Sequence, residues 1–276
     1  MPLLSTIGAA SSRGFGQFIG GITPPGQDTY YGYDATGDFS WVAPAGIESI
    51  CVAAVGQAGN GIQWQIGSGG GGLGYKNNIT VVPGNSYDVK IALRTATGYP
   101  QTLGNAHFIN ATTCMGGGGG NYQTSGGGGN YAGDGGGNGG DGATVGGACP
   151  DVSYAGSGGG AGGYSGAGGD AGDYSGGGST SGAAGSGGGG GGGRECGINP
   201  NTTTYGGGHI LLLGEGSSGA SSAGQGNGGS GGANGGSTTS LGGGAVGGNT
   251  STRGWAGVRI LWGAGRAYPS TNTGDV

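Results

Sequence analysis

Hydrophobic and polar positions alternate most clearly in residues 86–93. From Tyr87 to Leu93 every second residue is apolar, while Ser86, Asp88 and Lys90 occupy the alternate positions. A two-residue period predicts a β-strand with one face buried. Other short apolar runs, several of them bounded by turns rich in Pro and Gly, occur at 39–44, 47–55, 75–82, 107–115, 209–213 and 257–262. We find no helical period, and we therefore predict an all-β protein, a β-sandwich of short strands.

Glycine interrupts this pattern in the centre of the chain. The sequence contains 86 glycines among 276 residues, and 61 of them lie in 116–254. This region is predicted to be a long glycine-rich insertion, with 209–213 as a candidate strand within it. A sandwich completed by the strand at 257–262 brings the two ends of the insertion together, so the insertion grows from one place on a rigid base. Closing so long a loop is tolerable because its entropic cost grows only logarithmically with length.

The insertion itself has two interpretations. One is a flexible brush, which is typical of glycine-rich, low-complexity segments. The other is a set of packed polyglycine II helices, which have three residues per turn and direct their peptide groups outwards to neighbouring helices. An inner helix must then be pure glycine, whereas an edge helix can carry a solvent-facing side chain at every third position.

The sequence contains both patterns, and we favour the packed helices. Uninterrupted glycine runs occur at 187–193 and 116–120. Side chains three residues apart, with glycine beside them, occur at Asn138, Asp141 and Thr144 and again at Asn227, Ser230 and Ala233. The predicted fold is thus an all-β sandwich with a long insertion of packed polyglycine II helices.

Charge and hydropathy exclude several classes of partner. Eight Lys and Arg residues stand against 13 Asp and Glu, giving a net charge of −5, and the basic residues form no cluster. We therefore expect no nucleic-acid partner. No apolar run reaches the roughly 18 residues that a membrane-spanning helix needs. The first residues lack the basic and apolar regions of a signal peptide.

Candidate catalytic and metal-binding residues are few. His107 and His209 both begin apolar runs and are interpreted as ordinary structural histidines. The stretch 136–141 resembles a calcium-binding turn but does not repeat with the required period. No nucleophile motif and no phosphate-binding loop stand out. We therefore expect a protein that is not an enzyme and that carries no cofactor and no metal.

The four cysteines show no zinc or thioredoxin spacing. Cys51 and Cys114 lie in strand-like runs and are predicted to be small buried thiols. Cys149 and Cys196 lie in interruptions of the glycine-rich region. A disulfide between them is one alternative, and two reduced thiols, as expected for a protein that folds in a reducing cytosol, are the other.

The two ends of the chain and its layout resemble a known family. Strand-and-turn segments Trp41-Val-Ala-Pro-Ala-Gly46 and Val82-Pro-Gly-Asn-Ser-Tyr87 precede the glycine-rich centre, and the chain closes with Val258-Arg-Ile-Leu-Trp-Gly-Ala-Gly-Arg-Ala-Tyr-Pro-Ser-Thr-Asn-Thr273. This layout resembles glycine-rich tail proteins of tailed bacteriophages, including virion proteins of phages that infect cyanobacteria. The opening stretch 4–16 also resembles the start of phage tail proteins. The glycine-rich centre is similar to the tail-fibre-tip adhesins of T-even-like phages.

This resemblance implies a receptor-binding role in the tail of a virion, for a protein made in the host cytoplasm. The implied partners are other tail proteins and a host surface receptor, which is either a glycan or an outer-membrane protein. A homo-oligomer is a further candidate. Interruptions rich in Tyr, Asn, Ser and Thr are the expected contact loops, since such residues suit recognition. The candidate receptor-binding residues are Tyr122, Tyr131, Tyr154, Arg194, Ile198, Asn199, Asn201 and Tyr205. The candidate virion-attachment residues are Phe15, Phe18, Trp262 and Tyr268.

The domain organisation follows from these assignments. We expect an N-terminal attachment segment at 1–38, sandwich strands at 39–115, the glycine-rich insertion with recognition loops at 116–254, and a closing strand with a C-terminal tail at 255–276. Deletion of 267–276 is expected to leave the protein folded. The alternative function is a purely structural virion protein, such as a tail, adaptor or capsid decoration subunit. A cellular wall protein is disfavoured because no signal peptide is found.

Overall fold

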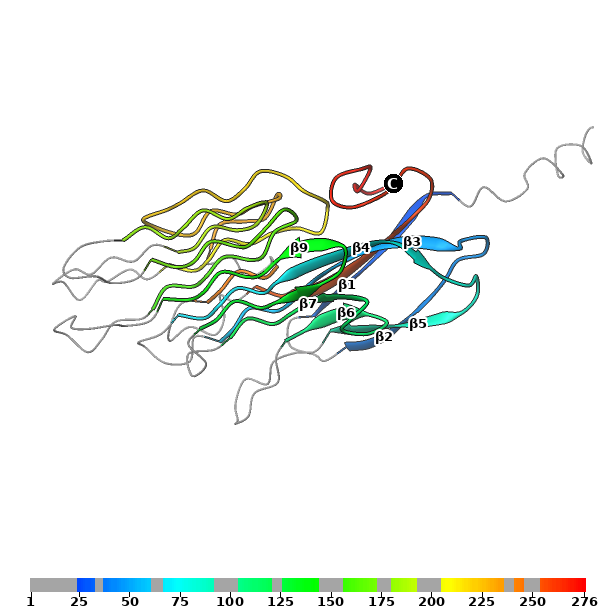
Figure 1. The fold of residues 1–276 in the computed structure, drawn as a ribbon, viewed down its shortest axis with the longest axis horizontal. Coiled ribbons are helices and arrows are strands. Elements are labelled where there is room, and N and C mark those ends of the chain that lie inside the picture. Colours follow the sequence, from blue (N-terminus) through cyan, green and yellow to red (C-terminus); the bar gives the residue numbers. More distant parts are fainter. Residues whose placement is uncertain are drawn as a thin grey trace, which may run out of the picture.

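The chain folds into two parts that lie end to end (Figure 1). The structure is a computed structural model that describes residues 24–32, 37–60, 67–91, 104–120, 126–143, 156–172, 180–192, 205–235, 241–245 and 254–276. Strands form one part, and glycine-rich segments running side by side form the other. The described residues contain no helix, which confirms the predicted all-β class.

In the described ranges, ten strands form two antiparallel sheets of five strands each. The first sheet has the order β1-β10-β3-β4-β9, and the second has the order β2-β5-β6-β7-β8. The strands are β1 Gly26–Gly32, β2 Gly37–Val42, β3 Ser49–Val55, β4 Leu73–Thr80, β5 Ser86–Ile91, β6 Ala106–Phe108, β7 Cys114–Gly116, β8 Tyr131–Ala132, β9 Gly135–Gly137 and β10 Ala256–Trp262. Strand β10 lies between β1 and β3, so the closing segment does complete the sheet that begins near the N-terminus.

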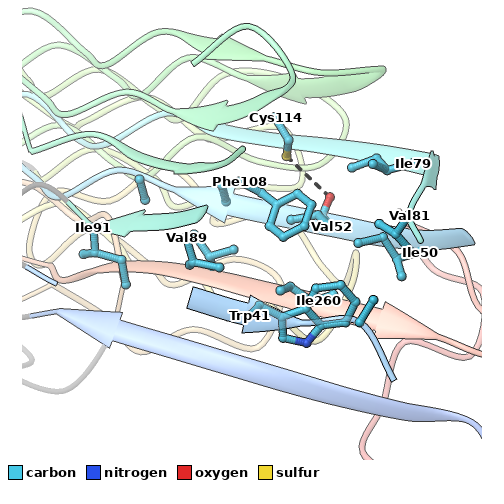
Figure 2. Close-up of a cluster of buried hydrophobic side chains, with 14 of the residues drawn as sticks. Trp41, Ile50, Val52, Ile79, Val81, Val89, Ile91, Phe108, Cys114 and Ile260 are labelled. Carbon is cyan, nitrogen blue, oxygen red and sulfur yellow. Dashed lines mark hydrogen bonds between the residues drawn. The ribbon is translucent and has the colours of Figure 1, made fainter. Parts of the chain in front are cut away.

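The apolar core lies between the two sheets (Figure 2). Val89 and Ile91 of β5 point into it and are fully buried, whereas Lys90 between them is exposed, as the alternation of the sequence predicts. Trp41 is the largest side chain of this core and makes an edge contact with Phe108, with ring centroids 5.9 Å apart. Aromatic contacts of this kind add to the free energy gained by removing apolar area from water.

The strand predictions differ from the structure in four places. Strands β8 and β9, which belong to the two sheets, lie within the region predicted to be the glycine-rich insertion and were not predicted. The run 107–115 is two strands, β6 and β7, because the turn at Ile109 reverses the chain with a positive φ of 64°. The run 209–213 is not a strand: it makes a single bridge from Ile210 to Leu241. Strand β1 was not predicted, because its sequence, Gly-Gln-Asp-Thr-Tyr-Tyr-Gly, has no run of aliphatic residues.

The glycine-rich segments are joined by backbone hydrogen bonds, and we call them together the glycine bundle. The segments are 56–60, 67–72, 116–120, 126–130, 137–143, 156–163, 167–172, 182–192, 205–209, 216–229 and 241–245. Two of them, 56–60 and 67–72, come from the stretch between β3 and β4. The bundle therefore includes glycines that precede the predicted insertion.

Segment 67–72 shows how the bundle is bonded. Its first and fourth N–H groups donate to 137–143, and its second and fifth donate to 241–245. Its third and sixth N–H groups donate to 116–120. Its carbonyl oxygens accept from three further segments, which are 56–60, 126–130 and 156–163. Successive peptide groups thus point to different neighbours, and the direction repeats every three residues, whereas a strand repeats every two.

Such close approach of backbones leaves no room for side chains. A Cβ atom added at Gly70 would collide with the carbonyl oxygen of Gly160, and one added at Gly71 would collide with that of Gly56. By contrast, a Cβ at Gly127 would meet nothing closer than the Asp141 carboxylate, at 3.9 Å. Glycine is therefore obligatory inside the bundle and replaceable at parts of its surface.

Side chains at spacing three lie on the surface of the bundle in one of the two sequence examples, as far as it is described. Asn138 and Asp141 are exposed, and the glycines between them are buried. Asp141 also accepts the Gly128 N–H at 2.7 Å, so its carboxylate satisfies a backbone donor at the surface. Ser230 differs: it is buried and its hydroxyl donates to the Gly187 carbonyl at 2.6 Å. Its positive φ of 44° places it in a turn rather than in an edge segment.

Residues 263–276, which we call the C-terminal strap, connect the sandwich to the glycine bundle. The Asn77 side chain pairs with the backbone of Tyr268 through two bonds of 2.8 and 2.9 Å. The Tyr268 hydroxyl donates to the Leu212 carbonyl at 3.2 Å, and the Thr273 hydroxyl donates to the Leu213 carbonyl at 2.6 Å. The strap thus contacts strand β4 on one side and, on the other, the stretch 211–214, which connects bundle segments 205–209 and 216–229.

Two buried arginines hold the strap. Arg259 of β10 is 2% exposed, donates to the Thr273 carbonyl at 2.9 Å and forms a 2.9 Å ion pair with Asp275. Arg266 donates to carbonyl oxygens of the strap itself and to that of Gly26 at the start of β1. Because charged groups are costly to bury without acceptors, the strap and the arginines depend on each other.

We predict that glycine is required inside the bundle but not at its surface. Gly70→Ala should lower the free energy of unfolding by several kcal/mol, because the methyl group displaces a neighbouring segment and breaks its hydrogen bonds. Gly127→Ala is the matched control and should be neutral or stabilising by about 0.5–1 kcal/mol. Thermal unfolding of both variants measures the difference. Equal melting temperatures would contradict the close packing described above.

The strap overturns the expectation that 267–276 can be deleted without loss of folding. Deletion removes the buried Tyr268 ring and the carbonyl oxygens that accept from Arg259 and Arg266. We predict that the chain ending at Arg266 is destabilised by at least about 3 kcal/mol, since two buried guanidinium groups lose acceptors. Removal of Val276 alone, which is 70% exposed, is the control and should leave the melting temperature unchanged. A truncated protein that melts like the full chain would disprove the structural role of the strap.

Candidate functional site

Several stretches of the chain lie outside the described residues. The described residues that border them meet at one end of the glycine bundle. The Gly69 N–H donates to the Gly120 carbonyl at 3.0 Å, and the Gly67 N–H donates to the Ala143 carbonyl at 3.1 Å. The Ala143 N–H in turn donates to the Ser157 carbonyl at 2.9 Å. Residues on either side of 61–66, 121–125 and 144–155 are thus hydrogen-bonded neighbours.

The same end gathers the borders of two further stretches. The Gly158 N–H donates to the Tyr205 carbonyl at 3.0 Å, and the Gly192 N–H donates to the Gly158 carbonyl at 2.9 Å. The Gly172 N–H donates to the Gly192 carbonyl at 3.0 Å. Residues bordering 173–179 and 193–204 therefore join the first group. We call this place the far end, because the opposite ends of 67–72 and 116–120 continue into strands β4 and β7.

The candidate receptor-binding residues divide between two places. Tyr122, Tyr154, Arg194, Ile198, Asn199 and Asn201 lie outside the described residues, in stretches bordered by the far end. Tyr205 lies at the far end, half-buried, where its carbonyl accepts the Gly158 N–H. Tyr131 lies at the opposite end, in β8, where it pairs with Gly116 of β7 and is 38% exposed. The structure therefore does not bring Tyr131 together with Tyr205.

The candidate attachment residues that the structure describes take part in packing. Trp262 is half-buried at the end of β10, with its ring centroid 6.0 Å from that of Trp41, and it also lines a recess of about 510 Å³ at the end of the sandwich. Tyr268 is only 3% exposed, and its ring stacks on Tyr164 at 5.8 Å. Its ring therefore stabilises the fold and presents no surface to a partner. Phe15 and Phe18 lie outside the described residues.

The described charged side chains between residues 116 and 254 are all acidic. Asp141 and Asp170 belong to the bundle, whereas Asp134 lies between β8 and β9 and Glu215 lies just before segment 216–229. Asp134 accepts the Asn77 N–H at 2.9 Å and forms a 2.9 Å ion pair with Lys76 of β4, and these two bonds lower the pKa of its carboxyl group. No described group of three or more acidic, His or Cys side chains is placed to hold a metal ion. Within the described ranges no helix is long and apolar enough to cross a membrane.

Burial keeps the side chains of His209 and Cys114 uncharged at neutral pH. Burial lowers the pKa of His209 to about 4, so its imidazole is neutral at pH 7. Cys51 and Cys114 are buried free thiols, as predicted, and burial raises the pKa of Cys114 to about 12. The Cys114 thiol contacts the Val52 carbonyl at 3.6 Å (Figure 2), and a protonated thiol of this kind is a poor nucleophile. The alternative of a Cys149–Cys196 disulfide lies outside the described residues.

Comparison with known proteins adds no assignment to this geometry. No protein-family model matches the chain, and no curated protein shows significant sequence similarity to it.

His209 is predicted to make the protein sensitive to acid. Its pKa is about 4 in the fold against 6.5 for the free side chain, so the unfolded chain binds a proton that the folded chain excludes between these values. Stability is therefore complete above pH 6.5 and falls as the pH approaches 4, by roughly 3 kcal/mol at most. Urea unfolding measures the free energy of unfolding of the parent and of His209→Gln. The difference between the two should change by up to roughly 3 kcal/mol between pH 6.5 and pH 4.

His107→Gln is the control for this measurement. Burial also lowers the pKa of His107, and Lys90 does so to a lesser extent, but this side chain is partly exposed. Its replacement should preserve most of the acid-dependent loss of stability. If His209→Gln loses stability between pH 6.5 and 4 as steeply as the parent does, the imidazole is not the responsible group.

Proposed function

We propose that this chain is a tail-tip or tail-fibre adhesin of a bacteriophage virion, without enzymatic activity. In this proposal the sandwich connects the protein to other tail proteins. The glycine bundle is a rigid platform, and the far end holds the segments that bind a host surface receptor. The proposal rests on the resemblance of the chain to phage tail proteins and on the arrangement of the bundle.

We infer further that the segments of the bundle are polyglycine II helices. Such helices have three residues per turn, so successive N–H groups leave the axis in three directions. The bonding of segment 67–72, with three donor neighbours and three acceptor neighbours, fits this geometry. Segment 156–163 has the same pattern: its N–H groups at 158 and 161 donate to 205–209, and those at 159 and 162 donate to 67–72. A bundle bonded in every direction resists bending, as a platform for recognition requires.

One observation carries the receptor-binding proposal: the borders of five separate stretches meet at the far end. Four of these stretches contain the sequence interruptions rich in Tyr, Asn, Ser and Thr. Loops on a rigid scaffold are favoured sites of recognition, and tyrosine with small polar residues suits contact surfaces. A rigid base also lowers the entropic cost of binding.

The charge of the glycine bundle limits the classes of receptor that it can bind. The described charges of the bundle are all acidic, so a polyanionic receptor would be repelled. A neutral glycan or a loop of an outer-membrane protein remains compatible with this surface. We propose that the receptor is one of these two.

We predict that exchanging 194–204 for a Gly/Ser segment of equal length abolishes adsorption of the phage to its host. Tyr205 is retained in this exchange because its carbonyl accepts the Gly158 N–H. The exchanged protein should still fold and be incorporated, since the described bonds of the bundle are unchanged. Adsorption assays on particles shown to contain the protein measure the effect.

Tyr131→Ala is the matched control, because this tyrosine lies at the opposite end of the bundle. It should leave adsorption at the parental rate. Parental adsorption by particles carrying the exchanged 194–204 segment would remove this segment as the receptor site and favour the purely structural virion protein.

A further inference from the structure

One segment of the glycine bundle is hydrogen-bonded to the other segments on one side only. Residues 216–225, drawn in yellow, run along the border of the bundle in Figure 1. The N–H groups of Gly219 and Ser222, three residues apart, donate to the Gly188 and Gly182 carbonyls at 2.8 and 3.3 Å. These bonds attach the segment to the rest of the bundle.

Other peptide groups of the same segment are open. Within the described ranges, the N–H groups of Ala220, Ser221 and Ala223 have no backbone acceptor, and all three residues are exposed. No described backbone N–H donates to the carbonyl oxygen of Ser221 or Ala223. Donors and acceptors are thus left for a further neighbour, as on the unpaired side of an edge strand in a β-sheet. We call residues 216–225 the open edge.

The surface around the open edge is uncharged and carries small side chains. Residues 181–186 lie next to it, since the Gly185 N–H donates to the Gly219 carbonyl at 2.9 Å. The exposed residues of these two ranges are Ser, Ala, Gly and Gln. Neither range contains a charged residue, although the whole chain carries a net charge of −5. No charged side chain therefore keeps a second backbone away from the open peptide groups.

Another surface of the bundle shows how an edge is closed. The Asp141 carboxylate accepts the Gly128 N–H at 2.7 Å, and the Asp170 carboxylate accepts the Asp141 N–H at 2.8 Å. Both aspartates are exposed. These carboxylates cap backbone donors and also place negative charge at the surface, and charged side chains at an exposed edge oppose pairing with another chain. The open edge has no charged side chain to serve in this way.

We propose that the open edge pairs with the open edge of a second copy of this chain, about a two-fold axis. Each copy offers the other both donors and acceptors with the same three-residue repeat, so one segment suffices for a self-complementary interface. The glycine bundle then continues from one copy into the other through backbone hydrogen bonds. This pairing does not rest on the receptor proposed for the far end.

Other partners match the open edge less well. A β-strand repeats every two residues, so its donors and acceptors do not stay in line with a three-residue repeat. A polyanion finds no basic side chain in either range. A segment with large side chains cannot bring its backbone within hydrogen-bond distance of the open groups. A second copy can, because its residues 216–224 are all Gly, Ala or Ser.

Sedimentation velocity of the full chain, at concentrations from about 1 to 500 µM, tests the proposal. We expect a monomer–dimer equilibrium with a Kd on the order of 10–100 µM, because the interface is small and buries little apolar area. At the highest concentration, hydrogen–deuterium exchange at the amides of Ala220, Ser221 and Ala223 should slow by at least about threefold. A chain that stays monomeric throughout this range overturns the proposal.

Two variants with the same change of charge localise the interface. Ser221 lies near the middle of the open edge, so in Ser221→Asp a two-fold axis brings two carboxylates together, and dimerisation should weaken at least about tenfold. Asn138→Asp adds the same charge at an exposed position three residues before Asp141, and it should dimerise like the parent. Unchanged melting temperatures verify that both variants fold. A dimer that Ser221→Asp weakens no more than Asn138→Asp does would also overturn the proposal.

Discussion

The structure depends on one interaction, the backbone hydrogen bond between neighbouring glycine-rich segments. Inner segments such as 67–72 and 156–163 donate to and accept from several others, and this is possible only where the missing Cβ lets backbones approach. Glycine loses more conformational entropy on folding than any other residue, so an ordered glycine segment must recover that cost from its neighbours. In the bundle this entropic cost is offset by hydrogen bonds between the peptide groups of neighbouring segments. The apolar side chains that stabilise an ordinary domain are confined to the sandwich and to its contact with the bundle.

The two kinds of stabilisation meet where the bundle joins the sandwich. There the Tyr164 and Tyr268 rings stack, and Tyr75 contacts both at a tilt. They lie beside Ile210 and Leu212 in an apolar cluster on the outer side of the first sheet. The C-terminal strap covers this cluster and is fixed by Arg259 and Arg266. Burial raises the pKa of Tyr164 above its ordinary value, so all its contacts are made by the neutral phenol. The strap therefore fixes the position of the glycine bundle against a β-sandwich that has a conventional core.

Much of the sandwich was predictable because its pattern is local. Side-chain polarity alone is enough to recognise the alternation around Val89 and Ile91. It is also enough to recognise the closing strand at 257–262. The exposed positions of Asn138 and Asp141 followed from a three-residue period. Ser230 has the same three-residue spacing but is buried, because the spacing alone does not show that this residue lies in a turn. Strand β1 was missed since its stability comes from pairing with β10, which is more than 220 residues away in the sequence. The attachment role assigned to Tyr268 misread a residue of the core, since a terminal position says nothing about burial.

The sideways direction of the bonds in the glycine bundle has a mechanical consequence. A force that pulls the far end away from the sandwich acts along the segments and across the bonds that join them. Such a load stretches many bonds in parallel, as in shear, instead of breaking them one after another as when a zipper is opened. The strap adds a second connection between the sandwich and the bundle. Tension at the far end is therefore shared between the strap and the chain segments that run from the strands into the bundle. A bundle made mostly of glycine, with little side-chain packing, is thereby suited to transmit tension along its length.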